Sequence, residues 1–165
     1  MTPQDVAGAA IQAVYGHLKK IFDEEVMSQV FPGIPVPRVS LDMPGDEPEP
    51  LHVFVWGTAR NFDAEGFLSG SYIEASFHVY VTVIATASTA ERASEIANAY
   101  QALALQLVIV DPLLGGLVTD SLAPKIEESA TWVDSTGSRH AGYLLDIGYT
   151  KYISASEAVA RAIKE

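Results

Sequence analysis

Hydrophobic positions at the start of the chain follow the period of a helix. Residues 3–30 carry apolar side chains at three- and four-residue spacing, which is typical of an amphipathic helix packed on a sheet. Thr2 would cap this helix, and Pro3 would take the first helical position, which proline favours. The apolar positions that set the spacing are Ile11, Val14, Leu18 and Ile21. We therefore expect one helix over residues 3–30.

A strict alternation of apolar and polar residues follows in the middle of the chain. It covers residues 72–85, and at about 3.3 Å per residue it predicts a strand of roughly 45 Å. Typical strands have about 5–6 residues, so this one should extend past the body of a small domain and pair with something there. Residues 51–60 predict another strand, with large side chains on both faces, and the loop 61–71 would join the two into a long hairpin.

A second helix is predicted over residues 88–110. Ser88-Thr89-Ala90-Glu91 has the pattern of a capping box at its start. In its second half the helix is apolar nearly all round, and a helix that is hydrophobic on every side is buried on every side. In a domain of this size we expect the second cover to be another subunit. Residues 111–116 predict a short helix that begins at Asp111 and ends at a glycine pair.

The remaining elements complete one α+β domain over residues 1–165. Residues 125–134 and 140–153 predict a second hairpin, and residues 155–165 predict a terminal helix. The expected order is therefore α-β-β-α-β-β-α. Strands in adjacent pairs with helices between them favour a mostly antiparallel four-stranded sheet, built from two hairpins, with helices packed on one face.

Proline interrupts this pattern between the first helix and the first strand. Residues 32–50 contain six of the nine prolines, which excludes regular helix and disfavours a central strand. The end of this segment is acidic, with Asp46, Glu47 and Glu49. We expect an extended acidic arm that lies on the surface, either as a functional loop or as a flexible connector.

Composition narrows the classes of function. Only 19% of the 165 residues are charged and 48% are hydrophobic, so we expect a partner to cover part of the surface. The formal net charge of −11 argues against a protein that grips nucleic-acid phosphates. With no cysteine there is no disulfide or thiolate metal site. The start of the chain does not resemble a signal peptide, and no apolar run reaches the ~18 residues of a membrane span, so we expect a soluble cytoplasmic protein.

Candidate catalytic chemistry is sparse. His52 and His78 fall on the same face of the first predicted hairpin, but only a cross-strand pairing would bring them together, and Glu74 lies too far along the strand to share a metal with His78. Glu127 and Glu128 are adjacent on a strand and point to opposite faces. No motif for phosphate cradling, metalloprotease or esterase chemistry occurs. We expect no enzyme, no cofactor and no metal.

Residues 97–150 carry a resemblance to a known family. The helix from Ala97 leads into Leu113-Leu114-Gly115-Gly116-Leu117-Val118, then a strand ends near Trp132-Val133-Asp134, and a last strand contains Gly142-Tyr143-Leu144-Leu145-Asp146-Ile147-Gly148-Tyr149. In these motifs and in its element order the chain resembles the tail terminator (tail completion) proteins of long-tailed bacteriophages. The motifs are packing patterns rather than catalytic signatures.

The resemblance implies a structural protein of the virion. Its family forms a ring, a hexamer, that caps the tail tube, stops polymerisation of the tube protein and joins the head-completion or neck protein. DNA passes through the lumen without specific binding, and an acidic bore would repel its phosphates. The expected location is the head-proximal end of the virion tail, and the host cytoplasm during assembly, with no membrane. No catalysis and no cofactor are implied.

Interface residues follow from the patterns rather than from the family. We expect the loop 61–71 to touch the tube or a neighbouring subunit, and the second half of the 88–110 helix to be covered by one, so that Leu105→Asp would give folded monomers. The outward-facing residues of the first predicted hairpin should pack against a second layer of protein; they are Phe54, Trp56, Tyr80 and Ile84. The full set of expected interface residues is Phe54, Trp56, Phe62, Phe67, Tyr80, Ile84, Leu105 and Ile109.

Two other readings remain open. A head-side neck or stopper protein, or another tail connector, would also be acidic and ring-forming. A small-molecule-binding α+β dimer would need a concave pocket with convergent polar groups, which the sequence does not indicate.

Overall fold

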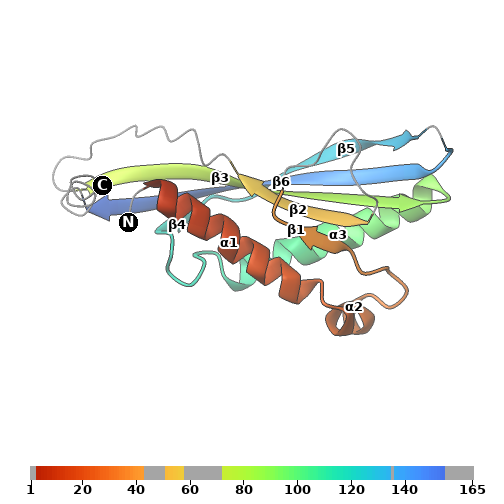
Figure 1. Cartoon of the computed structure of the whole chain (residues 1–165), viewed down its shortest axis with the longest axis horizontal. Helices are drawn as coiled ribbons and strands as arrows, with labels where there is room; N and C mark the ends of the chain where they lie inside the picture. Colours follow the sequence, from red (N-terminus) through yellow and green to blue (C-terminus); the bar gives the residue numbers. More distant parts are fainter. Residues whose placement is uncertain (1–2, 43–50, 58–71, 135, 155–165) are drawn as a thin grey trace.

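The chain folds as an α+β domain in which one long sheet carries helices on one face (Figure 1). The computed structural model describes residues 3–42, 51–57, 72–134 and 136–154. The elements in chain order are α1 (Pro3–Ile21), α2 (Glu24–Val30), β1 (Arg38–Ser40), β2 (His52–Gly57), β3 (Tyr72–Ala87), α3 (Ala90–Val110), β4 (Asp120–Ser121), β5 (Lys125–Val133) and β6 (Arg139–Ser154). The predicted terminal helix 155–165 lies outside the described residues.

Two strands of 16 residues each, β3 and β6, form the centre of the sheet. They pair antiparallel along their whole length, from Tyr72 opposite Ser154 to Ala87 opposite Arg139. The predicted alternation is therefore confirmed, and the strand runs two residues further than expected. Odd-numbered residues of β3 such as Phe77 face the core and meet buried partners on β6. The part of β3 that exceeds a typical strand length is therefore paired with β6.

The sheet has six strands in the described part of the chain, and it is mixed. The order is β1-β2-β3-β6-β4, with β5 also paired to β6, and β1 runs parallel to β2. The prediction of four strands in the order α-β-β-α-β-β-α was wrong. The sheet is mixed because β1 is parallel to β2, while the other four strand pairings in the described part are antiparallel. Both predicted hairpin pairings, β2 with β3 and β5 with β6, are present as antiparallel ladders. The error came from the short strands β1 and β4, which are too brief to show a period.

The proline-rich segment contributes one of these short strands. Residues 38–40 contain no proline, and Arg38 donates its backbone N–H to the carbonyl of Leu51 at 2.9 Å as β1 joins the edge of the sheet. Proline is tolerated beside an edge strand because no ladder hydrogen bond is lost there. The expectation of an arm without secondary structure over residues 32–50 is corrected for residues 38–40, while residues 43–50 lie outside the described part.

Helices α1 and α3 pack on the same face of the sheet, as predicted. α3 buries a stripe of small and large side chains that includes Ala93, Ala97 and Tyr100. By length and composition α3 could cross a membrane, but this buried stripe is what the core helix of a globular domain presents. The Tyr100 hydroxyl donates to the Pro35 carbonyl at 2.6 Å, and its ring meets Phe22 edge-on, so α3 holds the N-terminal segments in place.

Three predicted helix boundaries differ in the structure. Residues 3–30 form two helices, because Phe22 turns into the core and the Asp23 side chain accepts from the Glu25 N–H to start α2. α3 is capped by Thr89 rather than Ser88, since the Thr89 hydroxyl accepts from the Arg92 N–H. The short helix expected over residues 111–116 is a turn.

Candidate functional site

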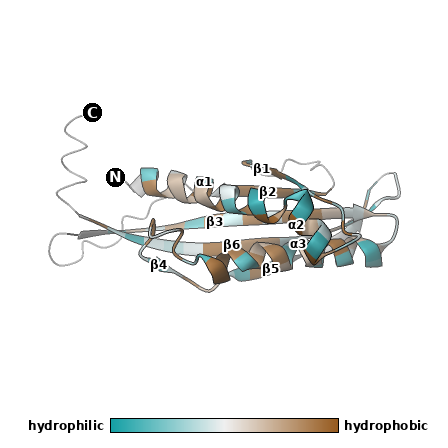
Figure 2. Cartoon of the chain, turned by 90° about the horizontal axis from the view of Figure 1, so that it is seen from below, coloured by the Kyte–Doolittle hydropathy of each residue, from teal (hydrophilic) through white to brown (hydrophobic). Residues whose placement is uncertain are grey.

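The C-terminal end of α3 leaves apolar side chains uncovered. Ile109 and Val110 are 72% and 77% exposed, and Leu113 in the following turn is exposed as well. Figure 2 shows α3 hydrophilic at its N-terminal end and hydrophobic toward its C-terminal end. We call Ile109, Val110 and Leu113 the α3-end patch. Apolar side chains gathered in this way are typical of a surface that another protein covers.

A network around Asp111 holds this end in one conformation. The Asp111 N–H donates to the Leu107 carbonyl at 2.9 Å, which closes the helix. Its carboxylate accepts from the Gly115 N–H at 2.8 Å and from the His17 ring, whose Nε2 lies at 3.0 Å. Gly115 has a φ of 68°, a conformation that glycine adopts without strain. The α3-end patch is therefore pre-organised, and a partner would pay little ordering entropy to bind it.

The two predicted interface residues on α3 differ in their burial. Leu105 is half-buried and packs against the core cluster, whereas Ile109 projects away from it. Of the two, Ile109 therefore has more area to offer a neighbour. An aspartate at Leu105 would disturb the core packing, so Leu105→Asp does not separate assembly from folding as we expected from the sequence.

Four predicted interface residues lie on the open face of the sheet, the face opposite α1 and α3. Phe54 and Ile84 are only 6% and 3% exposed within the subunit, so they have little area left for a neighbour. Trp56 and Tyr80 are half-exposed, sit opposite each other on β2 and β3, and stack with ring centroids 4.4 Å apart. The Trp56 Nε1–H donates to the Thr82 hydroxyl at 3.0 Å, which fixes the indole.

The surroundings of Tyr80 are acidic. Burial raises the pKa of the Tyr80 hydroxyl, and the negative charges of Asp146 and Glu127 raise it further. The open face around the Trp56–Tyr80 stack therefore combines aromatic surface with negative charge. Predicted residues Phe62 and Phe67 belong to the loop 61–71, which lies outside the described residues.

His52 and His78 lie apart and contact different partners. His52 stands opposite Ile84, six positions along β3 from His78, so the cross-strand pair considered from the sequence does not form. His78 Nδ1 lies 2.6 Å from an oxygen of Asp146, and His52 Nε2 lies 2.6 Å from the Ser40 hydroxyl. Within the described ranges, no three histidine, aspartate or glutamate side chains gather in a way that could hold a metal ion.

A cluster around His140 was not found from the sequence. His140 Nε2 lies 2.8 Å from the Asp134 carboxylate, its Nδ1 lies 2.7 Å from the Thr86 hydroxyl, and Trp132 stacks on its ring at 5.1 Å. Asp134 also accepts from the backbone N–H of Thr136 and from that of Ser138. The turn itself was predicted, but its connection to β3 was not, because that contact is set by the strand register. The cluster closes the tip of the β5–β6 hairpin.

These hydrogen bonds make the hairpin tip sensitive to acid. The Thr136 and His140 side chains hold the pKa of the Asp134 carboxyl well below its usual range. A carboxyl whose pKa is lowered on folding adds stability above its unfolded pKa of about 3.9, and this stability is lost as the pH falls toward the folded value. We expect Asp134→Ala to unfold several degrees below the unmodified protein at pH 7, and the difference to shrink steadily below about pH 4.

Thermal unfolding followed by circular dichroism measures this effect. Asp120→Ala is the matched control, because the described contacts of its carboxylate include a single hydrogen bond, from the Ser121 N–H. A difference between Asp134→Ala and the unmodified protein that stayed constant down to pH 3 would contradict the assignment.

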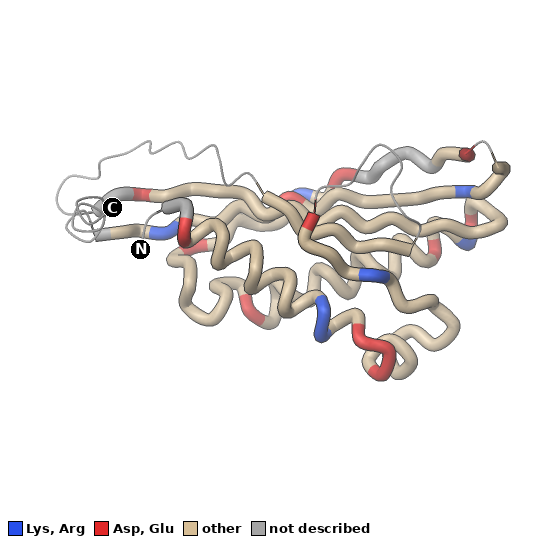
Figure 3. The backbone as a smooth tube through the Cα atoms, in the orientation of Figure 1, with Lys and Arg blue, Asp and Glu red and all other residues tan. Residues whose placement is uncertain are grey.

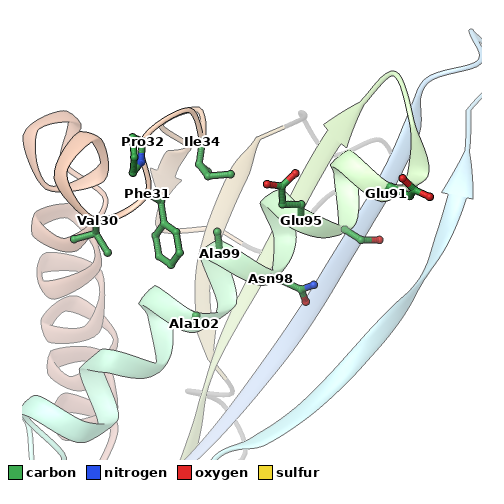
Figure 4. A pocket seen from close by; sticks show the side chains of 10 residues that line it. Val30, Phe31, Pro32, Ile34, Glu91, Glu95, Asn98, Ala99 and Ala102 are labelled. Carbon is green, nitrogen blue, oxygen red and sulfur yellow. The ribbon is translucent and has the colours of Figure 1, made fainter.

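A groove runs along the exposed side of α3, facing the connection from α2 to β1 (Figure 4). Its volume is about 640 Å³. Phe31, Ile34, Ala99 and Ala102 make one part of its lining apolar, and the glutamates of the first α3 turns make the other end acidic. The sequence carries no signal for this groove, because its two walls are some sixty residues apart in the chain.

Acidic residues are spread over the described part of the molecule. Figure 3 shows acidic residues at the helix termini and near the strand ends, with few and well-separated Lys and Arg residues in the described part. Charge also lies in the middle of the sheet, where Asp146 stands opposite both Tyr80 and Lys125. The described residues thus present apolar and acidic surface but no basic stripe of the kind that binds nucleic acid.

The sequence matches no protein-family model and no curated protein.

Proposed function

We propose that this protein is a structural subunit of a phage tail, a terminator that assembles into a ring, as a hexamer, at the head-proximal end of the tail tube. The observation that carries the proposal is the α3-end patch, a pre-organised apolar surface in which Ile109 and Val110 are largely exposed. In this proposal a neighbouring subunit covers the patch. The ring would stop polymerisation of the tube protein and join the tail to the neck protein.

The shape and charge of the subunit support this proposal. A strand pair of 16 residues on a small body gives an elongated subunit, which suits a wall around a channel. A negative charge of −11 per subunit would keep DNA phosphates from adhering during passage. Assembly would take place in the host cytoplasm, and the ring would then remain in the virion.

The runner-up is a head-side neck or stopper subunit, or another tail connector. The same patch and the same charge support it equally, so the binding partner decides between the two.

The observation that favours a small-molecule-binding dimer is the groove beside α3. Its polar side chains, Glu91, Ser94, Glu95 and Asn98, all come from one exposed helix face. Binding pockets for small molecules usually draw convergent polar groups from several elements, so this reading has less support.

Electron microscopy of the purified protein mixed with tail tubes tests the proposed function. We expect six-fold rings at one end of each tube and no binding to capsids that lack tails. Binding to the capsid portal instead would favour the neck reading. A closed dimer that binds neither would overturn both.

A further inference from the structure

We propose that Thr86, His140 and Asp134 form a nucleophilic site, in which the Thr86 hydroxyl takes up a small acyl group from an activated ester. The inference goes beyond the proposed function, because it does not depend on assembly, on a tail tube or on DNA. It rests on the end of the sheet where β3, β6 and the turn after β5 meet (Figure 1). There the three side chains form one continuous chain of hydrogen bonds.

Strand register brings these side chains together. Thr86 stands directly opposite His140 in the β3–β6 ladder, so the two side chains lie on the same face of the sheet as neighbours. The turn after β5 brings the Asp134 carboxylate to the other side of the imidazole. Trp132, which stands opposite His140 on β5, stacks on the ring with centroids 5.1 Å apart. The ring is therefore held in one orientation toward Thr86.

Asp134 fixes the position of the proton on this ring. The Thr136 and His140 side chains hold the pKa of the Asp134 carboxyl well below its usual range, so at neutral pH it is ionised and can only accept hydrogen bonds. His140 Nε2 therefore carries the hydrogen that is donated to Asp134 across 2.8 Å. In the neutral imidazole the other nitrogen, Nδ1, is then an acceptor, and the Thr86 hydroxyl donates to it at 2.7 Å.

This arrangement is the one that activates a hydroxyl nucleophile. The hydroxyl needs an adjacent base, and the base needs a third group that fixes its tautomer and its orientation. Thr86 takes the first role, His140 the second, and Asp134 is the positioning residue. Thr86 is half-buried and His140 is 9% exposed, so a small reagent can reach the hydroxyl while the base is largely shielded from water.

The reaction would proceed in two steps. In the first, the Thr86 oxygen bonds to the carbonyl carbon of the ester and its proton moves to His140 Nδ1. The bond from that carbon to the leaving oxygen breaks, and the leaving alcohol takes the proton. In the second step His140 takes a proton from water, whose oxygen attacks the acyl-threonine and releases a carboxylic acid and the free Thr86 hydroxyl. The substrate class is therefore a small ester with a good leaving group.

Thr82 provides a matched comparison on the same strand. It lies four residues before Thr86 on the same face of β3, and it is also half-buried. Leu144 rather than a histidine stands opposite it, and its hydroxyl accepts from the Trp56 Nε1–H. A difference in reactivity between the two threonines therefore isolates the contribution of His140.

Acetylation of the full-length protein by p-nitrophenyl acetate tests the proposal. Exposed lysines and histidines also react with this ester, so the acetyl groups are located by peptide mass spectrometry. We expect Thr86 to be acetylated about a hundredfold faster than Thr82, the lower end of what a general base contributes. His140→Gln should abolish this difference, because the base is lost. Asp134→Asn should reduce it, because an amide no longer selects the tautomer in which Nδ1 accepts.

Variants of Thr86 separate chemistry from structure. Thr86→Ser retains a hydroxyl and should still be acetylated, whereas Thr86→Val should not, and circular dichroism shows whether each variant is folded. The comparison of Thr86 with Thr82 needs no variant, so it decides the question even where a substitution unfolds the protein. Equal acetylation of the two threonines, or acetylation of Thr86 that survives in folded His140→Gln, would overturn the proposal. Acetylation at Thr86 in a protein that ignores tail tubes would instead refute the proposed function alone.

Discussion

Replacing both Ile109 and Val110 with aspartate is expected to convert the assembled protein into a folded monomer. Both side chains are more than seventy per cent exposed in the subunit, so the change costs the subunit little stability. In an interface each apolar side chain of this size contributes about 1.5–3 kcal/mol when buried, and a carboxylate left unpaired there adds a desolvation penalty. At 1.4 kcal/mol for each tenfold change in affinity, we expect the contact to weaken at least a thousandfold.

Sedimentation velocity measures the loss of assembly, and circular dichroism confirms the fold. Val133→Asp is the matched control, because Val133 is also an exposed apolar residue but lies at the β5–β6 tip, next to the start of α3 and about 30 Å from the patch. It should assemble like the unmodified protein. Rings that persist in the double variant would show that the α3-end patch is not a subunit contact, and the proposed function would lose its main support.

Phe77→Ala is expected to lower the free energy of unfolding by about 3–5 kcal/mol. Phe77 is only 2% exposed and its ring centroid lies 5.8 Å from that of Tyr149 on β6. It lies just beyond Val79, the last β3 residue that β2 pairs with, where the sheet continues as β3, β6 and the two-residue strand β4, which pairs with β6 at Tyr149. Removing the ring therefore leaves a cavity in the core cluster.

Urea unfolding followed by fluorescence gives this free energy. Ser76→Ala is the matched control, because Ser76 is the neighbouring residue on the open face and is exposed. It should change stability by less than about 0.5 kcal/mol. A loss below about 1 kcal/mol in Phe77→Ala would mean that this part of the sheet contributes little to the core.

The two variants probe properties that differ in how well the sequence predicts them. The long strand containing Phe77 was predicted from its period of two, and the apolar end of α3 was predicted from the loss of helical amphipathicity. Which of the apolar residues on α3 would remain exposed was not predictable. In the sequence pattern Leu105 and Ile109 are both simply apolar, yet Leu105 packs on the core and Ile109 does not.

The candidate site was predicted in part for the same reason. Trp56 and Tyr80 were expected to share a face of one hairpin, and the structure stacks their rings. The burial of Phe54 and Ile84 on that face was missed, since it depends on side chains that come together across strands. The contact of His140 with Thr86 was missed as well, because it joins residues 54 positions apart.

The sequence by itself determined the local elements of this protein: two strands of unusual length, two amphipathic helical regions, the turn at the β5–β6 hairpin and an acidic surface. Periodicity and capping depend on residues that are close together in the chain, so they can be recognised in the sequence alone. Only the tertiary structure decided that β1 joins the sheet in parallel, that Asp111 ends α3 in a turn rather than starting a helix, and that Phe31 faces Ala99 across a groove. Those outcomes depend on which distant segments compete for the same buried surface, and that competition is settled only when the whole chain packs.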